Sequence, residues 1–229
     1  DIMDKPDIVY EDDNIIVCNK KAGVASQSER SFANDLTSML MTYLVSSGRK
    51  CNVHIINRLD KPVEGLVLYA LNKKAAAGLS ALSGEHAIEK YYYAVVTGRP
   101  ENKGNYTDYL LKDPGLNVSR VADADVSGAK KASLNYETLE TKEISGREYS
   151  LVRIRLLTGR HHQIRVQFAA HGHALYGDTK YNPDFAGCRG VQLMLCAYRI
   201  AFANPAGADR ITVQIRPGGK FTEFEYFHD

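Results

Sequence analysis

The stretch of sequence that decides the fold is YSLVRIRLLTGRHHQIRVQFAAHGHALYG, at residues 149–177. Its first nine residues are expected to form a strand, followed by a turn at Gly159. A helix is expected from about His161 to His171, with Gly172 as its stop. Such a junction leaves free N–H groups and the positive end of the helix dipole at the turn. The junction therefore favours binding of a phosphate or a carboxylate.

The charge of this stretch supports the same interpretation. It contains no acidic residue, and its cationic or titratable side chains are Arg153, Arg155, Arg160, Arg165, His161, His162, His171 and His173. Arg160 would lie at the positive end of the helix, where a cation is unfavourable unless an anion is close. A solvated basic face accounts for the composition equally well, so the pattern alone leaves both interpretations open.

The four histidines also raise the possibility of a metal site. His161-His162 and His171-x-His173 lack the i,i+4 spacing of a helical ligand pair, although His161 or His162 could meet His171 in space. No carboxylate lies among them to complete a ligand set. Because a histidine in an arginine-rich stretch more often hydrogen-bonds a ligand or the backbone, we expect no metal.

A second informative stretch places Asp60 between two apolar strands expected at 53–56 and 66–71. A carboxylate at the rim of the core needs an opposite charge, or its pKa rises. Arg58 or an arginine of residues 149–177 could supply that charge, and an ordinary turn aspartate is the alternative. Glu64 suggests a glycosidase-like carboxylate pair with Asp60, but the proline between them disrupts helical i,i+4 geometry.

A third stretch reads Glu89-Lys-Tyr-Tyr-Tyr93 and is expected to lie in a strand. Side chains alternate across a strand, so Tyr92 should point away from the face that carries Tyr91 and Tyr93. An aromatic side chain beside a basic surface can stack on a nucleobase. A tyrosine buried in the core fits the pattern as well.

The rest of the chain predicts more strands than helices. A helix that opens at Ser31 would place Leu36, Leu40 and Leu44 on one face, and Asn72 would cap a second helix at 73–82. Residues 100–132 resemble a long irregular connection. Further strands are expected at 14–19, 90–97, 133–139, 149–157, 191–202, 211–215 and 221–227.

This pattern predicts an α+β fold, with a mixed but mostly antiparallel central sheet and flanking helices. No linker-like segment divides the chain, so we expect a single domain over residues 1–229.

Composition narrows the class of protein. The 229 residues are 44% hydrophobic and 24% charged, with a net charge of +2, which excludes a disordered chain. The longest apolar runs are too short to span a membrane, and no signal peptide is visible. Four cysteines without a C-x-x-C pair argue against disulfides and zinc, and we expect a cytoplasmic monomer.

Three motifs, in this order, resemble those of the RluA-type family of pseudouridine synthases. The first is Asn57-Arg-Leu-Asp-Lys-Pro-Val-Glu-Gly-Leu66, and the second is Lys-x-Tyr-x-Ala at Lys90, Tyr92 and Ala94. The third is Thr158-Gly-Arg-His-His-Gln-Ile-Arg165, followed by His171-Gly-His-Ala-Leu-Tyr-Gly-Asp-Thr-Lys-Tyr181. The resemblance covers nearly the whole chain, and it implies a single catalytic domain over residues 1–229 with a catalytic cleft.

The resemblance implies that the protein isomerises a uridine of structured RNA, ribosomal or transfer, by breaking the N1–C1′ bond and forming C5–C1′. Asp60 matches the catalytic aspartate, a nucleophile or base. Arg165 matches the arginine that pairs with this aspartate, and Tyr92 matches the tyrosine that stacks on the uracil. The target base must leave its helix to enter a pocket.

The remaining assignments also follow from the resemblance. The resemblance assigns four residues either to contacts with RNA or to support of the pocket: Arg58, Arg160, His162 and Gln163. The partner is RNA rather than a membrane, and no metal, nucleotide or redox cofactor is implied. The RNA-binding domain of the S4 type that many relatives carry is not present in residues 1–229.

The sequence departs from the family pattern around the aspartate. Val63-Glu64 replaces the usual Thr-Ser, and Asn57 replaces the usual His. These changes put the choice of the RNA target in question, since Glu64 would repel a nearby phosphate. They also motivate a second hypothesis, an RNA-binding protein that keeps the fold and has lost catalysis.

Overall fold

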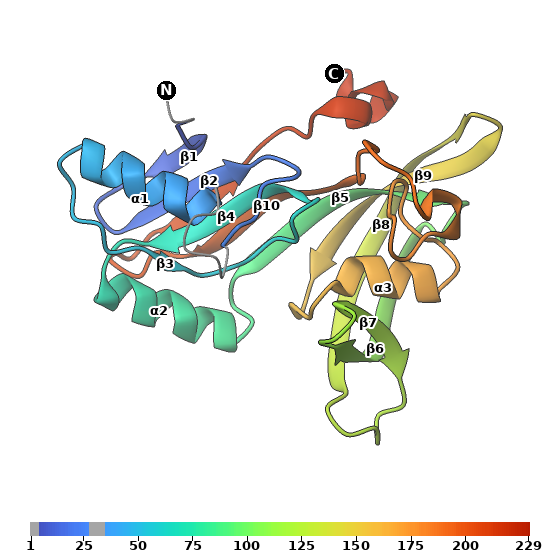
Figure 1. Cartoon of the computed structure of the whole chain (residues 1–229), viewed down its shortest axis with the longest axis horizontal. Coiled ribbons are helices and arrows are strands. Elements are labelled where there is room, and N and C mark those ends of the chain that lie inside the picture. The colour runs from blue at the N-terminus through green and yellow to red at the C-terminus, as the bar shows by residue number, and fades with distance from the viewer. Residues whose placement is uncertain (1–4, 28–34) are drawn as a thin grey trace. The chain divides into compact units, whose positions relative to one another are not determined.

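The computed structural model describes residues 5–27 and 35–229, which form two compact units (Figure 1). Unit 1 comprises Asp1–Glu89 and Ala197–Arg216, and unit 2 comprises Lys90–Cys196 and Pro217–Asp229. In the part of the chain that the structure describes, no helix is both long and apolar enough to cross a membrane.

Unit 1 is built on a mostly antiparallel sheet. Its strands are β1 (Ile8–Glu11), β2 (Ile15–Lys20), β3 (His54–Ile55), β4 (Glu64–Ala70), β10 (Leu195–Ala203) and β11 (Arg210–Gln214). They follow the order β1-β2-β4-β10-β11, and β3 also pairs with β4. Residues of β10 from Ala197 onward belong to this unit.

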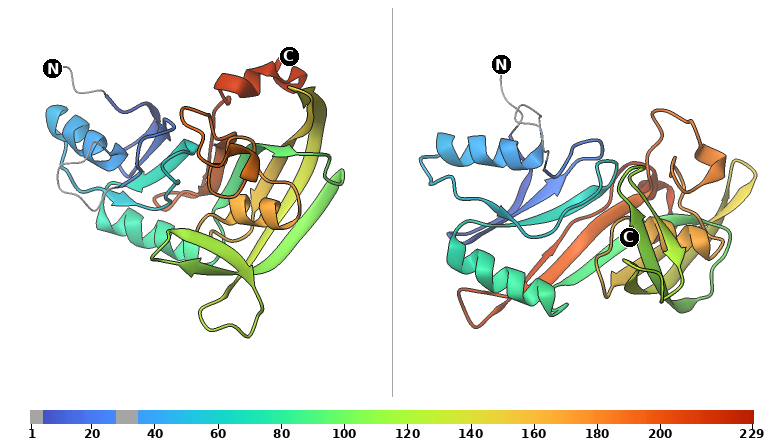
Figure 2. Two further views of the ribbon diagram at one scale, coloured as in Figure 1. Left: turned by 45° about the vertical axis from the view of Figure 1, so that its right-hand side comes forward. Right: turned by 60° about the horizontal axis from the view of Figure 1, so that its bottom comes forward.

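Two helices cover opposite faces of this sheet, as the right-hand view of Figure 2 shows. On one face, Leu66 and Leu68 of β4 share a core cluster with Leu79 of α2 (Lys73–Gly84). On the other face, the hydroxyl of Tyr69 lies 3.0 Å from the hydroxyl of Thr37 in α1 (Leu36–Ser46). The alternation along β4 thus sends successive side chains to different helices.

The strands of unit 2 follow the order β5-β9-β8-β6-β7, and each of these neighbouring pairs is antiparallel. Its strands are β5 (Glu89–Thr97), β6 (Lys103–Asp113), β7 (Val118–Ala122), β8 (Lys130–Ile144) and β9 (Arg147–Leu156). One α-helix, α3 (Gln163–Ala170), and short 3₁₀ turns at Pro183–Phe185, Gly219–Glu223 and Glu225–Phe227 complete the described elements.

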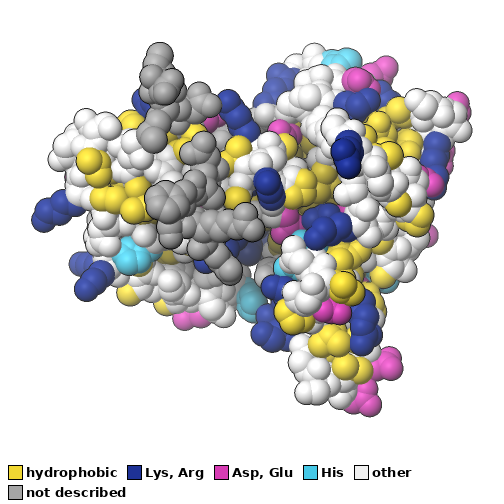
Figure 3. Space-filling view, viewed as in Figure 1, with side chains coloured by type: hydrophobic (Ala, Val, Ile, Leu, Met, Phe, Trp, Pro, Cys, Tyr) yellow, Lys and Arg dark blue, Asp and Glu magenta, His cyan; other side chains and the backbone are white. Residues whose placement is uncertain are grey.

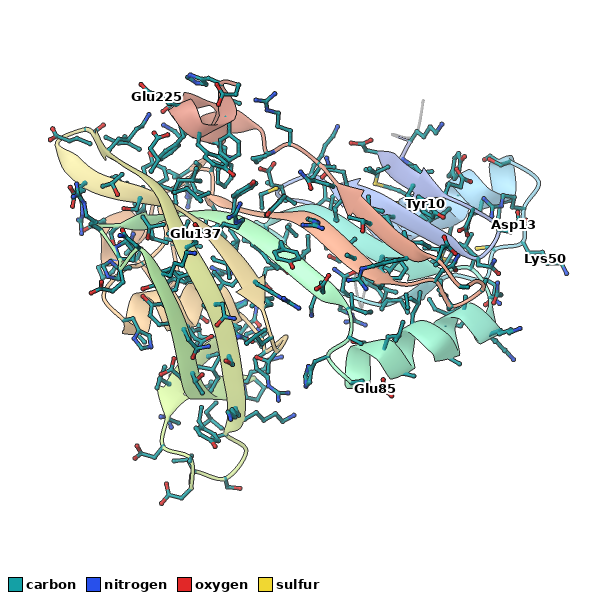
Figure 4. All side chains as sticks on the ribbon, turned by 180° about the vertical axis from the view of Figure 1, so that it is seen from behind. Tyr10, Asp13, Lys50, Glu85, Glu137 and Glu225 are labelled. Atoms are coloured by element: carbon teal, nitrogen blue, oxygen red, sulfur yellow. The ribbon has the colours of Figure 1, made fainter. Side chains whose placement is uncertain are left out.

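The sheet of unit 2 has two differently covered faces. On the face that we call inner, Tyr106 and Tyr136 pack on Phe168 of α3, with ring centroids 5.0 and 5.5 Å apart. On the opposite, outer face, Tyr93 packs on Phe227 of the C-terminal turn at 5.0 Å. Figure 4 shows the unit from behind.

The structure confirms much of the expected fold and corrects parts of it. The α+β class and the mixed, mostly antiparallel sheet are confirmed, as is the cap of α2, where Asn72 accepts a hydrogen bond from Ala75 N. The irregular connection at 100–132 was a wrong prediction, because β6, β7 and the start of β8 occupy more than half of it. The strand at 221–227 was also wrong, since that segment forms 3₁₀ turns whose three phenylalanine side chains are buried.

Two helix starts also differ from expectation. Ser31 lies outside the described residues, and α1 begins after Asp35, whose carboxylate accepts a hydrogen bond from Ser38 N at 2.7 Å. α3 begins at Gln163 rather than near His161, because His162 adopts a left-handed conformation with φ 54°. The single domain over residues 1–229 stays a prediction.

Candidate active site

Asp60 lies in the turn before β4, and the backbone around it is firmly held. Ser26 Oγ accepts a hydrogen bond from Leu59 N and donates one to Leu59 O, at 3.0 and 2.9 Å. The turn itself is closed by Val63 N, which donates to Asp60 O at 2.9 Å. The buried side chains of Leu59 and Val63 anchor the turn on both sides of the half-buried carboxylate.

A buried lysine lies beneath this turn. The Lys20 ammonium is fully shielded from solvent and donates to the carbonyl oxygens of Lys21, Val24 and Lys61, at 3.0, 2.7 and 3.0 Å. Burial lowers the pKa of Lys20 to about 8, while the carboxylates of Asp60 and Glu64 raise it. Lys20 therefore ties the backbone next to Asp60 to the end of β2.

The strand predicted at 14–19 stops one residue before Lys20, so the sequence pattern did not indicate this role. Lys20 ends β2, where every other residue except Asn19 is also buried. A lysine at the inward end of a buried strand is the signal that would have revealed it, because a lysine there needs acceptors.

The residues before Asp60 have separate tasks. Asn57 accepts a hydrogen bond from Leu68 N at 2.7 Å and donates to Leu66 O at 3.2 Å, so it supports β4. Arg58 is exposed and donates to the Gln27 side chain at 2.8 Å. This exposure leaves the Arg58 guanidinium accessible to a ligand in solution.

Tyr92 belongs to unit 2 and lies on the inner face of its sheet. It pairs with Ile154, which in turn pairs with Tyr136 on that face. Tyr91 instead lies on the outer face, with the Arg155 guanidinium 5.7 Å from its ring centre. The alternation expected from the sequence is confirmed, and Tyr92 is mostly buried, with 7% of its surface exposed.

Arg165 is fixed by a buried ion pair in unit 2. Its Nε and Nη2 donate to the two carboxylate oxygens of Asp178, at 2.8 and 2.9 Å, and both side chains are almost completely buried. The Arg165 guanidinium also lies 5.2 Å from the ring centre of Tyr181. Asp178 is therefore a site residue that the sequence analysis did not single out, although it lies in the quoted motif.

A hydrogen-bond chain joins the start of α3 to β7. His162 Nδ1 lies 2.7 Å from the Tyr181 hydroxyl, which accepts a hydrogen bond from Ser119 N at 2.9 Å. His161 stacks on His162 with ring centroids 3.7 Å apart, and its Nδ1 lies 2.7 Å from Ser119 Oγ. The pair of histidines thus holds α3 against β7.

Gln163 is buried, and its polar atoms are used inside the protein. Its Oε1 accepts hydrogen bonds from Thr158 Oγ1 and Arg160 N, while its Nε2 donates to Ser133 O and Gln167 Oε1. An amide side chain has four such positions, and all are occupied. These bonds fix the Thr-Gly-Arg turn before α3.

The basic stretch at 149–177 does not form one surface. Arg153 points to the outer face and pairs with Glu137, labelled in Figure 4, at 2.6 Å. Arg155 is also on the outer face, and Arg165 is buried. Arg160 donates through Nε to Lys131 O at 2.9 Å. On the face seen in Figure 3, Lys and Arg side chains gather over the part of unit 2 that holds α3, β6 and β7.

Each of the four histidines in residues 149–177 makes a hydrogen bond within the protein. His171 stacks on Tyr106 at 3.9 Å and contacts Asp108, and His173 Nδ1 lies 2.8 Å from Thr97 O. Among residues 5–27 and 35–229, no three His, Cys, Asp or Glu side chains gather as metal ligands would.

The structure thus places the candidate residues in both units. Asp60 and Arg58 belong to unit 1, while Tyr92, Arg165 and the start of α3 belong to unit 2. The pairing of Asp60 with Arg165 would join the two units and stays a prediction.

Comparisons with known proteins decide the family. The family model described as RNA pseudouridylate synthase matches residues 14–170, more than half of the chain. The chain belongs to the RluA-type family of RNA pseudouridine synthases. The matched span of this pseudouridine synthase includes Asp60, Tyr92 and Arg165, while Asp178 lies beyond it.

Several curated relatives resemble this pseudouridine synthase. A tRNA pseudouridine synthase C of Haemophilus ducreyi is 32% identical over 90% of this chain and 89% of its own length. A ribosomal large subunit pseudouridine synthase D of Zymomonas mobilis is 33% identical over 76% of this chain and 55% of its own length. The chain therefore spans about half of the second relative.

Solved structures show the same fold. The human RNA pseudouridylate synthase domain containing 1 superposes with a TM-score of 0.77 at 23% identity, over 93% of this chain and 84% of that one. The human domain containing 4 gives a TM-score of 0.76 at 20% identity, over 94% and 90%. Both place the present chain in the pseudouridine synthase fold.

Proposed function

We propose that Asp60 is the catalytic carboxylate with which this RNA pseudouridine synthase isomerises a uridine. The observation that carries the proposal is the fixed Asp60 turn, tied to β2 by Lys20 and to Ser26 by two hydrogen bonds. A carboxylate on a rigid turn is preorganised to act on a bound nucleoside as nucleophile or base. The reaction breaks N1–C1′, forms C5–C1′, releases the C5 proton to water and leaves a proton on N1.

Arg165 and Tyr92 are proposed to complete the site. The Asp178 carboxylate holds the Arg165 guanidinium in one orientation, which suits an arginine that must orient a second carboxylate, that of Asp60. Tyr92 is proposed to stack on the flipped uracil, because it lies on the inner face of its sheet, away from Tyr91 and Arg155.

The remaining candidates divide into RNA contacts and supporting residues. Arg58 and Arg160 are proposed to contact RNA, since each keeps a cationic head group outside any ion pair among the described residues. His162 and Gln163 are proposed to support the turn before α3, because both are buried and hydrogen-bonded within the protein.

Transfer RNA is the substrate class that we propose to test first, and large-subunit ribosomal RNA the second. The tRNA synthase of Haemophilus ducreyi aligns with this chain over most of both lengths, whereas the ribosomal relative of Zymomonas mobilis aligns over 55% of its own. We further propose a cytoplasmic monomer that works without a nucleotide cofactor. Its four cysteines are free thiols, which fits a reducing compartment.

Release of tritium from RNA labelled at uridine C5 tests this function. The wild type should release tritium from unmodified tRNA or ribosomal RNA transcripts, and Asp60→Asn should release none, because an amide cannot act as the nucleophile or base. Arg58→Gln serves as a folded control that should keep the chemistry and weaken binding.

Two outcomes would contradict the proposal. Equal release by the wild type and Asp60→Asn would remove Asp60 from the chemistry. Retention of RNA by a wild type that releases no tritium from any transcript would instead support a protein that only binds RNA.

A further inference from the structure

Lys90 is a cationic residue that has no role in the active site proposed above. It lies at the start of β5 and pairs with Leu156, two residues before Tyr92. Because strand residues i and i+2 share a face, Lys90 lies on the inner face with Tyr92, about 7 Å further along the strand. It is therefore placed beside the aromatic side chain that we propose to hold the uracil.

The ammonium of Lys90 lies against the Thr-Gly-Arg turn. A Cβ atom at Gly159 would come within 2.9 Å of Lys90 Nζ, so the end of this flexible side chain lies directly against the glycine. The turn is rigid, since Thr158 Oγ1 and Arg160 N both donate to Gln163 Oε1. Gly159 itself is exposed, which leaves this place open to a ligand.

Lys90 has no counterion among the residues that the structure describes. Neither its ammonium nor the Arg160 guanidinium pairs with a carboxylate there. Burial lowers the pKa of Lys90 below its ordinary value, and no acidic neighbour opposes that shift. A lysine that only covered apolar surface would extend its ammonium into water instead.

Two cations next to one exposed glycine, with no acid to balance them, form a place that an anion would stabilise. We propose that Lys90 Nζ binds one backbone phosphate of the RNA substrate, next to the nucleotide whose uracil lies on Tyr92. This inference rests on the proposed function, because it uses Tyr92 as the stacking residue. It assigns Lys90 a binding and positioning role, with Gly159 as the residue that leaves space for the phosphate.

The contact can be tested by removing the charge from either partner. The probe is an unmodified tRNA transcript on which the wild type is active, prepared with a neutral methylphosphonate at the 5′ or the 3′ phosphate of the target uridine. One of the two neutral linkages should weaken binding to the wild type about tenfold, as loss of a charge-assisted hydrogen bond would. Lys90→Met should bind the charged and the neutral transcript equally.

Salt dependence gives a second readout with a matched control. Lys90→Met should reduce the slope of log K against log salt by about 0.7 to 0.9, the effect of one phosphate contact. Lys103→Met removes an equal charge from an exposed position on β6, which pairs with Glu137 on the outer face, and should leave the slope unchanged. KM should rise more than kcat falls in Lys90→Met.

The inference is overturned if neither neutral linkage changes binding to the wild type, a measurement that needs no variant. It is also overturned if Lys90→Met and Lys103→Met change the slope alike. Failure of the proposed function has a different signature, because the wild type would then release no tritium from any transcript.

Discussion

Single side chains in this synthase carry charge into places with little water, and two of them show how differently such charges are balanced. Lys20 is surrounded by three carbonyl oxygens, which satisfy its hydrogens without neutralising its charge. Arg165 instead meets the Asp178 carboxylate in a bidentate pair. The cost of burial therefore remains visible in the titration of Lys20, whereas the Asp178 carboxylate offsets the buried charge of Arg165.

The lowered pKa of Lys20 predicts a dependence of stability on pH. The unfolded chain binds a proton at this lysine up to about pH 10.5, whereas the folded chain releases it near pH 8. Because the unfolded state holds more protons in this interval, the contribution of Lys20 to the free energy of unfolding rises from pH 8 to 10.5, by about 3 kcal/mol.

Urea unfolding of the wild type and of Lys20→Met at several pH values checks this prediction. The difference between the two free energies cancels the titration of other lysines and tyrosines. The difference in unfolding free energy should shift in favour of the wild type as the pH rises from 8 to 10.5. A difference that does not change with pH would show that Lys20 titrates normally in the folded protein.

The Arg165–Asp178 pair predicts a large loss of stability when one charge is removed. Asp178→Asn leaves the Arg165 guanidinium without this carboxylate in a place closed to water, which should reduce the free energy of unfolding by about 3 to 5 kcal/mol. The matched control is Glu137→Gln, whose partner Arg153 is about one-third exposed. It should reduce stability by less than about 1 kcal/mol, and similar losses in the two variants would contradict the argument.

At the scale of elements, Gly65 shows how closely two strands of unit 1 approach. It lies in β4 with φ 129°, and a Cβ atom there would come within 2.4 Å of Ala197 O in β10. Gly65→Ala should therefore cost about 3 kcal/mol or more in unfolding free energy, from backbone strain and from separation of the strands.

Gly84, at the end of α2, provides the control in the same unit. It has nothing within 4 Å of a Cβ atom, and it lies in a helix. Gly84→Ala should leave stability unchanged or raise it by up to about 1 kcal/mol. Thermal unfolding of both variants measures the contrast, and a tolerated Gly65→Ala would mean that β4 and β10 can move apart.

Local signals explain which elements could be predicted from the sequence. Asn72 before an alanine-rich run predicted α2, and alternating apolar residues predicted β2, β4 and β5. β6 was not predicted from the sequence because its buried residues, Tyr106 and Leu110, lie among polar ones. They gain their packing partners from α3 and β8 only in the folded protein. The C-terminal aromatic run alternates like a strand, yet its rings pack around turns.

The same distinction applies to the site. Asp60, Tyr92 and Arg165 could be named as candidates because their motifs resemble those of the family, whose chemistry requires those residue types. Lys20 and Lys90 could not, because their importance depends on burial, and that of Lys90 also on the lack of a counterion among the described residues, which only the packed structure reveals. Asp178 belongs to the same class, since its partner lies thirteen residues away on a helix.

For the molecule as a whole, the net charge of +2 is a sum over segregated parts. The first fourteen residues carry six acids, and residues 149–177 carry none. The structure divides the second group further, because Arg165 is used internally and Arg153 and Arg155 lie on the outer face. The cations next to the Thr-Gly-Arg turn are therefore few, and each should contribute measurably to RNA affinity.

The cysteines allow one measurement to probe both units at once. Cys18 in β2 and Cys196 in β10 are fully buried, while Cys51 and Cys188 are exposed, and all four are free thiols. Burial raises the pKa of the Cys18 thiol to about 12, which further suppresses the reactive thiolate.

Iodoacetamide at pH 8 should therefore modify two cysteines of the native protein rapidly and all four in urea. Peptide mass spectrometry should assign the fast sites to Cys51 and Cys188, which lie in different units. Fast modification of Cys18 would mean that β2 is not held in the core, and the anchoring of the Asp60 turn by Lys20 would then fail with it.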